Sequence, residues 1–169
     1  MFLTPHVAVG VAIGSLIPNP VIAVPLALAS HFVLDAVPHW DDIGLGRLNQ
    51  RQGRIPGPPF RRILLDFLLA LSFVLFFVYW SMPDWGVAVN ISACAIAAIL
   101  PDAYYIPVAF FGWRWGFVMW VVRLQSRVQQ AAKAPRLFGL LTQAFSVTAS
   151  YLLAHQQILV QLPQAWKIL

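Results

Sequence analysis

The segment from Ile63 to Ser81 most constrains the fold, because its 19 residues carry a single charged side chain, Asp66. A helix needs about 20 mainly apolar residues to cross the hydrocarbon core of a bilayer. The segment ends in Tyr79 and Trp80, and such aromatic residues gather at the interface between membrane and water. Residues 60–81 are therefore predicted to form a membrane-spanning helix.

The composition extends this prediction to the whole chain. Of its 169 residues, 60% are hydrophobic and 10% are charged, whereas a soluble domain is about half apolar and a quarter charged. An integral membrane protein is predicted, with one domain over residues 1–169 and no separate soluble domain. The single cysteine, Cys94, excludes an intrachain disulfide.

Apolar runs separated by turns rich in Pro and Gly predict an all-α polytopic bundle of four to six helices. The helices are expected at residues 5–17, 21–37, 60–81, 85–100 and 137–160. Gly10 and Gly14 are four residues apart on the first helix, a spacing that permits close helix approach. Pro101 is expected to end the helix that begins at residue 85.

A further helix, over residues 113–131, is predicted to be amphipathic and to lie in the headgroup region of the membrane. One face carries apolar side chains: Trp113, Phe117, Trp120, Leu124 and Val128. Its basic residues lie mainly elsewhere. For the arginine-rich loop that carries Arg47, Arg51 and Arg54, the expected partner is anionic lipid headgroups rather than nucleic acid.

The basic residues also predict the orientation. They concentrate in residues 47–62 and 114–136, whereas the turn at 82–84 carries only an acid, Asp84. Because basic loops stay in the cytoplasm, both basic segments are expected there and the turn outside.

The second expected helix ends in a cluster of His and Asp. His31 and Asp35 are four residues apart, so they share one face of the helix, a spacing that offers two ligands to one metal ion. Such residues inside a span are costly unless they are paired or functional. Pro38 should end the helix, so that His39 could turn back toward the same point.

The expected topology brings polar residues from four segments to the cytoplasmic rim. They are His6, His31, Asp35, His39, Asp66 and Asp102. Five of these are candidate metal ligands, and Asp66 is the candidate general base that would act on a water molecule. Mixed His and Asp ligands suit Zn²⁺ or Mn²⁺.

Each of these residues also has a simpler interpretation. Asp66 could pair with Arg62, Asp102 could cap a helix, and His6 could bind only a neighbouring backbone group. His155 is expected at the opposite rim and outside any site.

Three short motifs resemble one family. Thr4-Pro5-His6, the run from Ser30 to Asp35 with Pro38-His39, and Leu100-Pro101-Asp102 are similar to the membrane-bound metal-dependent hydrolases, the YdjM-like inner-membrane proteins of bacteria. The likeness covers most of residues 1–110.

The resemblance implies a multi-helix membrane protein with a metal centre. Its ligands would be His6, His31, Asp35, His39 and Asp102. The His-Arg-Gly-x-x-His-Ser motif typical of the family has no counterpart here.

Three functions follow. The first is a metal-dependent hydrolase of the bacterial inner membrane that acts on a phosphoester or other lipid-borne ester at the cytoplasmic interface. The second is a non-catalytic scaffold or complex subunit, with lateral protein partners or a second copy of the chain, which seven Trp residues and the small residues of 85–100 would suit. The third is an ion or proton carrier, which intramembrane carboxylates can mark, although here the acids gather on one side.

Overall fold

The computed structural model describes residues 1–40, 57–103 and 115–161. Within these ranges the chain forms six helices and no strand. They are α1 (Leu3–Leu16), α2 (Pro20–Ala36), α4 (Gly57–Ser81), α5 (Trp85–Ala103), α7 (Gly116–Ala131) and α8 (Arg136–Gln161). The predicted all-α bundle is confirmed. The loop arginines of segment 47–54, and Trp113 of the predicted amphipathic face, lie outside the described residues.

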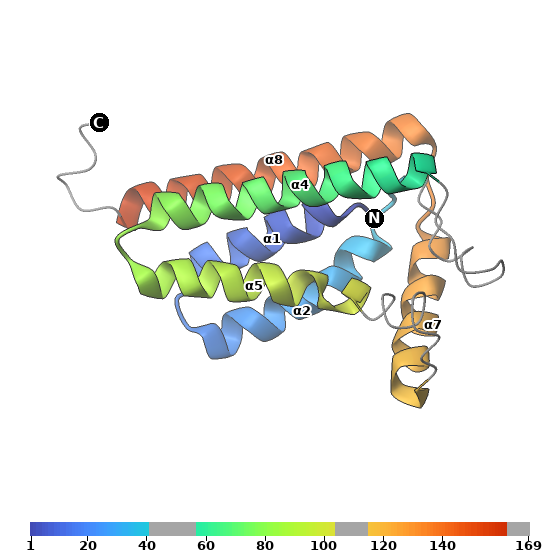
Figure 1. Cartoon of the computed structure of the whole chain (residues 1–169), viewed down its shortest axis with the longest axis horizontal. Coiled ribbons are helices and arrows are strands. Elements are labelled where there is room, and N and C mark those ends of the chain that lie inside the picture. The colour runs from blue at the N-terminus through green and yellow to red at the C-terminus, as the bar shows by residue number, and fades with distance from the viewer. Residues whose placement is uncertain (41–56, 104–114, 162–169) are drawn as a thin grey trace.

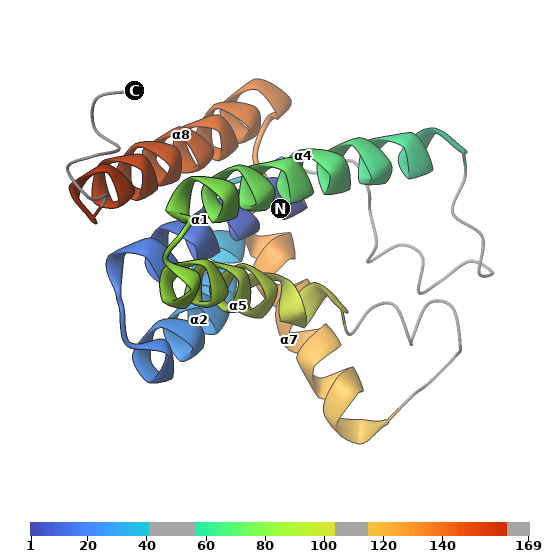
Figure 2. The same ribbon diagram turned by 60° about the vertical axis from the view of Figure 1, so that its left-hand side comes forward.

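Helix α1 is the centre of the bundle, since it contacts α2, α4, α5 and α8. These five helices run roughly along one direction, and α7 lies across one end of them, packed on α2 and α5 (Figures 1 and 2). The starts of α1, α4 and α8 and the ends of α2 and α5 meet at that end (Figure 1).

Close contact between α1 and α5 depends on the predicted glycine pair. A Cβ atom at Gly10 would lie 2.7 Å from the carbonyl oxygen of Cys94, and one at Gly14 would lie 2.8 Å from the Cα atom of Ile91. Both distances are too short for a real side chain, so only glycine allows the two backbones to approach this closely. Asn90 strengthens the contact by donating from Nδ2 to the Gly14 carbonyl oxygen at 2.8 Å.

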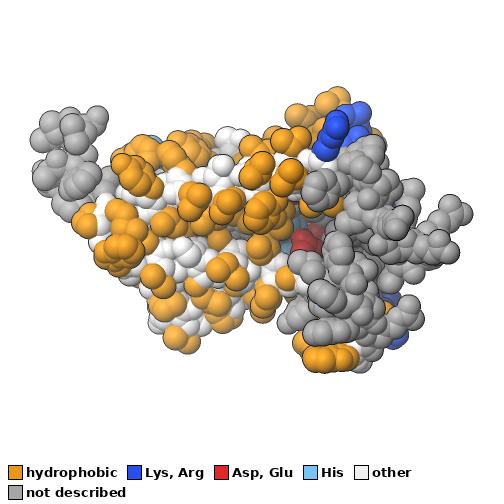
Figure 3. All heavy atoms as spheres, viewed as in Figure 1, with side chains coloured by type: hydrophobic (Ala, Val, Ile, Leu, Met, Phe, Trp, Pro, Cys, Tyr) orange, Lys and Arg blue, Asp and Glu red, His pale blue; other side chains and the backbone are white. Residues whose placement is uncertain are grey.

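Three helices are long and apolar enough to cross a membrane, within Arg61–Ser81, Trp85–Ala103 and Arg136–Val160. The helix predicted over residues 60–81 is thus confirmed, within α4, and it is long and apolar enough to span a bilayer. Figure 3 shows hydrophobic side chains over the length of the bundle, whereas the Lys and Arg side chains in view gather at the end where α7 lies. Exposed Leu and Phe side chains on α4 and α8 suit a surface surrounded by lipid.

The helix expected over residues 85–100 was predicted to end before Pro101. This end was wrong, because α5 continues through Pro101 to Ala103. Proline lacks an N–H, so Pro101 leaves the Ala97 carbonyl without its helical hydrogen bond. One lost bond does not stop the helix, which includes Asp102 and Ala103, the last described residues of this range. Asp102 therefore lies on a helical turn and not after the helix.

Helix α7 has two apolar faces. Val118, Val121 and Val122 are buried against the bundle, whereas Phe117 and Trp120 of the predicted aromatic face are 65% and 59% exposed. The exposed aromatic face and the position of α7 across the bundle end agree with the expected amphipathic helix.

Candidate metal centre

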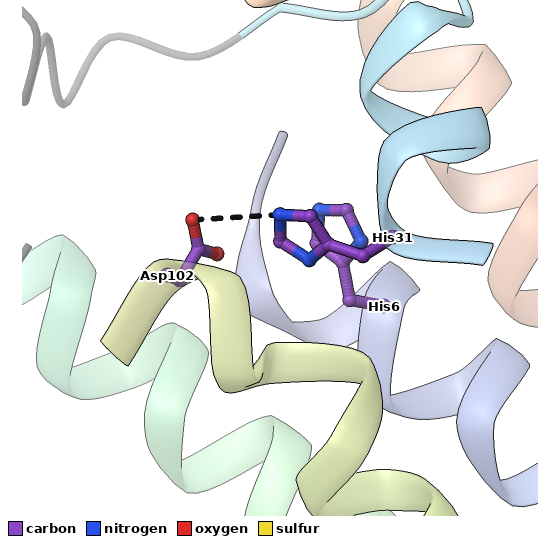
Figure 4. A group of neighbouring side chains, drawn as sticks. All are labelled: His6, His31 and Asp102. Carbon is purple, nitrogen blue, oxygen red and sulfur yellow. Dashed lines mark ion pairs between the residues drawn. The ribbon is translucent and has the colours of Figure 1, made fainter. Parts of the chain in front are cut away.

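The site lies where three helices meet at the α7 end of the bundle. His6 is in the first turn of α1, His31 and Asp35 are in the last turns of α2, and Asp102 is in the last turn of α5. Figure 4 shows the two imidazole rings stacked and the Asp102 carboxylate pointing toward them. The predicted meeting of residues from separate segments is found for these four side chains.

Asp35 lies against both histidines. Its Oδ1 is 3.3 Å from Nε2 of His6, and its Oδ2 is 3.4 Å from Nε2 of His31. The ring centroids of the two histidines are 4.1 Å apart with 20° between their planes. All three side chains are fully buried, so their polar atoms depend on one another rather than on water.

Asp102 is the fourth side chain of the cluster and the one that is partly exposed. Its Oδ1 is 3.8 Å from Nε2 of His31, and its side chain is 23% exposed. His6, His31 and Asp102 each offer a ligand atom within 4.8 Å of the other two. Ligands bonded to one tetrahedral ion at about 2.0–2.2 Å lie about 3.3–3.6 Å apart, so the 3.8 Å between His31 and Asp102 is close to a ligand spacing, and the group as a whole would have to contract slightly around an ion.

The protonation of His31 follows from its second contact. Nδ1 lies 2.7 Å from the carbonyl oxygen of Ala98, and because a carbonyl only accepts, Nδ1 carries the hydrogen. In the neutral ring Nε2 then carries the lone pair, on the side of Asp35 and Asp102 and 3.0 Å from Nε2 of Gln125. A backbone carbonyl that holds the far nitrogen is the usual arrangement for a metal-binding histidine.

His6 is the least satisfied residue of the cluster. It is fully buried, and in the part of the chain that the structure describes neither ring nitrogen makes a well-formed hydrogen bond, although Nε2 has the 3.3 Å contact with Asp35 Oδ1. Leaving a buried polar group unsatisfied costs about 1–3 kcal/mol. A cation between the ring nitrogens and the carboxylates would bind His6 Nε2, so the residues present fit a divalent ion with His and Asp ligands.

His39 lies outside the group of His6, His31 and Asp102. Its Nδ1 is 2.8 Å from the Val37 carbonyl oxygen, and its backbone pairs with the segment between α7 and α8, donating to Ala132 O and accepting from Ala134 N, both at 3.0 Å. The turn after Pro38 therefore directs His39 toward α8. Its role as a ligand stays a prediction from sequence.

Asp66 caps α1. Its carboxylate accepts from Leu3 N at 2.5 Å, from Thr4 N at 3.0 Å and from Thr4 Oγ1 at 2.6 Å. The first N–H groups of a helix have no partner within it, and here a neighbouring helix supplies the acceptor. Catalysis by Asp66 would need this carboxylate to leave the backbone, and its role as a base stays a prediction.

Two glutamines of α7 belong to the cluster and were missed. Gln129 Nε2 donates to Asp35 Oδ2 at 3.0 Å, and Gln125 Nε2 donates to Asp102 Oδ1. One sequence feature could have indicated Gln125. Val118, Val121 and Gln125 follow the i, i+3, i+7 pattern of one helix face, which is the face of α7 that is buried. The amino group of Met1 also donates to Asp35 Oδ1, at 3.2 Å.

The expected position of His155 is confirmed. It lies near the far end of α8, where its ring contacts Trp80 and Tyr151 with centroid distances of 5.2 and 5.5 Å. It is therefore a histidine of this protein that can serve as a control for the site.

Comparison with known proteins adds no relative. No protein-family model, no curated protein and no solved structure matches this chain. The resemblance to the membrane-bound metal-dependent hydrolases thus rests on the motifs around His6, His31 and Asp102.

Proposed function

We propose that this chain is a metal-dependent hydrolase of the bacterial inner membrane that acts on a phosphoester or other lipid-borne ester at the cytoplasmic interface. The observation that carries the proposal is the fully buried ring of His6, whose Nδ1 has no hydrogen-bond partner among the described residues and whose Nε2 faces Asp35 Oδ1 at 3.3 Å, next to a second histidine. A cluster of acceptors with an unused buried lone pair favours a cation.

In this proposal His6, His31 and Asp102 hold a Zn²⁺ or Mn²⁺ ion, and Asp35, whose oxygens face Nε2 of both rings, lies on the ion's side of the rings and adds a further carboxylate to the site. A divalent ion in such a site would supply a nucleophile by lowering the pKa of a water molecule toward neutrality. Asp102 is the partly exposed carboxylate of the cluster. The Ala98 carbonyl, which accepts from Nδ1 of His31, would keep the Nε2 lone pair of that ring directed at the ion.

The surroundings of the cluster favour a lipid-borne substrate. The site lies at the bundle end where Arg123 and Arg127 of α7 are exposed, and basic side chains near a membrane surface attract anionic headgroups. The exposed Trp120 and Phe117 would keep α7 at headgroup depth. Lipid phosphates would therefore reach Asp102 from the membrane surface.

A scaffold is the second candidate, and one observation favours it. Met1, Gln125 and Gln129 donate hydrogen bonds to Asp35 and Asp102, so much of the cluster is satisfied by the protein itself. In that case the polar network would only join α1, α2, α5 and α7, and the exposed apolar faces would bind neighbouring membrane proteins or a second copy.

The test is hydrolysis by purified protein reconstituted in vesicles that contain phosphatidylglycerol. We expect release of a phosphorylated or fatty-acid product that stops with a chelator and returns with Zn²⁺ or Mn²⁺. His6→Ala should abolish the release and His155→Ala should leave it unchanged. A wild-type protein that binds the ion and releases nothing from such vesicles would favour the scaffold.

A further inference from the structure

Gln125 reaches into the centre of the cluster from α7. Its side chain is fully buried, and its Nε2 lies 3.0 Å from His31 Nε2 and 3.5 Å from Asp35 Oδ2, besides donating to Asp102 Oδ1. The amide nitrogen therefore lies between three groups that are ligand candidates for one ion.

The Gln125 amide has fewer hydrogens than the number of acceptors around its nitrogen. An NH₂ group has two hydrogens, and here it faces three acceptors. Its other end, Oε1, is buried without a hydrogen-bond partner in the described part of the chain. The partial positive charge of the NH₂ group thus occupies the place where a cation would balance the acceptors, and an acceptor oxygen is left unused.

A cation at this place would reverse the preferred orientation of the amide. Bonds of about 2.0–2.2 Å from the ion to His and Asp ligands bring its positive charge against the N–H groups of Gln125. Rotation of the amide by half a turn about its last side-chain bond exchanges the oxygen and the nitrogen. Oε1 then faces the ion, and amide carbonyl oxygens do bind divalent cations.

We propose that Gln125 is a further ligand of the ion held by His6, His31 and Asp102, binding through Oε1 after its amide turns over. The inference rests on the proposed metal centre. It makes α7 part of the site, because the interfacial helix supplies a ligand that the bundle helices do not. Gln129, one turn further along, contacts Asp35 alone in the cluster and is the matched control.

The experiment is a titration of purified wild-type and variant proteins with Co²⁺, followed by the visible absorption of the bound ion and by competition with a chelator. Gln125→Leu should lower the Co²⁺ affinity at least about tenfold and change the absorption band, because a ligand is lost. Gln129→Leu should cause a much smaller loss and keep the band. Thermal unfolding of each variant identifies those that are folded.

Gln125→Glu separates a ligand from a simple hydrogen-bond donor. A carboxylate cannot donate, but it can bind the ion, so we expect affinity at or above that of the wild type. Affinity of Gln125→Glu below that of Gln125→Leu would overturn the inference, because repulsion from Asp35 and Asp102 would then dominate. Wild type that binds Co²⁺ together with an unaffected Gln125→Leu would refute the Gln125 ligand alone, whereas wild type that binds no Co²⁺ would refute the metal centre as well.

Discussion

His31 donates from Nδ1 to the carbonyl oxygen of Ala98 at 2.7 Å, which joins the end of α2 to the last turns of α5. The contact lies near Pro101. Because proline has no N–H, the helical hydrogen bond from residue 101 to the Ala97 carbonyl is already absent in this part of α5. It fixes the ring so that Nε2 faces Asp35 and Asp102. The same bond therefore supports the packing of two helices and directs the nitrogen that we propose as a metal ligand.

Asp35→Asn should lower Zn²⁺ affinity at least about tenfold, because the shape is kept while the charge beside both histidines is lost. Equilibrium dialysis with metal analysis measures the change. Asp84→Asn is the matched control, since Asp84 lies at the far end of the bundle and accepts from Val87 N at 3.1 Å. Equal affinities of the two variants would remove Asp35 from the site.

Asp66→Ala should destabilise the fold by about 1–2 kcal/mol, as the loss of a helix cap does, and should leave Zn²⁺ affinity unchanged. Thermal unfolding in detergent measures the first effect and dialysis the second. Asp66→Asn keeps acceptor oxygen for Leu3 and Thr4 and should lose less stability. A stable Asp66→Asn protein that binds Zn²⁺ but has lost hydrolysis would restore Asp66 as the base.

Gly14→Ala should destabilise the protein strongly, because the new Cβ would lie 2.8 Å from the Cα atom of Ile91 and force α1 away from α5. Gly116→Ala is the control, as nothing lies within 4 Å of its Cβ position and Ala favours a helix by up to about 1 kcal/mol. Unfolding midpoints of both variants test the contact. Equal midpoints would mean that α1 and α5 do not pack through Gly14.

The sequence predicted the helices and the meeting of His6, His31, Asp35 and Asp102, because apolar runs and their order determine which ends share a membrane face. It did not predict Gln125, since a glutamine among arginines suggests a solvated face until the packing of α7 is known. The capping by Asp66 was missed for a similar reason. Its partner atoms, Leu3 N and Thr4 N, are backbone groups on a distant helix, and no side-chain pattern marks them.

Cysteine labelling tests the orientation. In a Cys94→Ala background, Asp84→Cys should react with an impermeant reagent added to intact cells, and Lys133→Cys should react only after lysis. The reason is that basic residues remain in the cytoplasm. Labelling of position 133 from outside would place the cluster at the opposite membrane surface.

The most direct test of the metal centre is the metal content of wild-type protein, purified without chelator, supplied with Zn²⁺ and dialysed. The account predicts about one bound ion per chain, lost in His6→Ala and in Asp102→Asn and retained in His155→Ala. Wild-type protein that is folded and retains no ion, or a His6→Ala variant that retains as much as wild type, would contradict it.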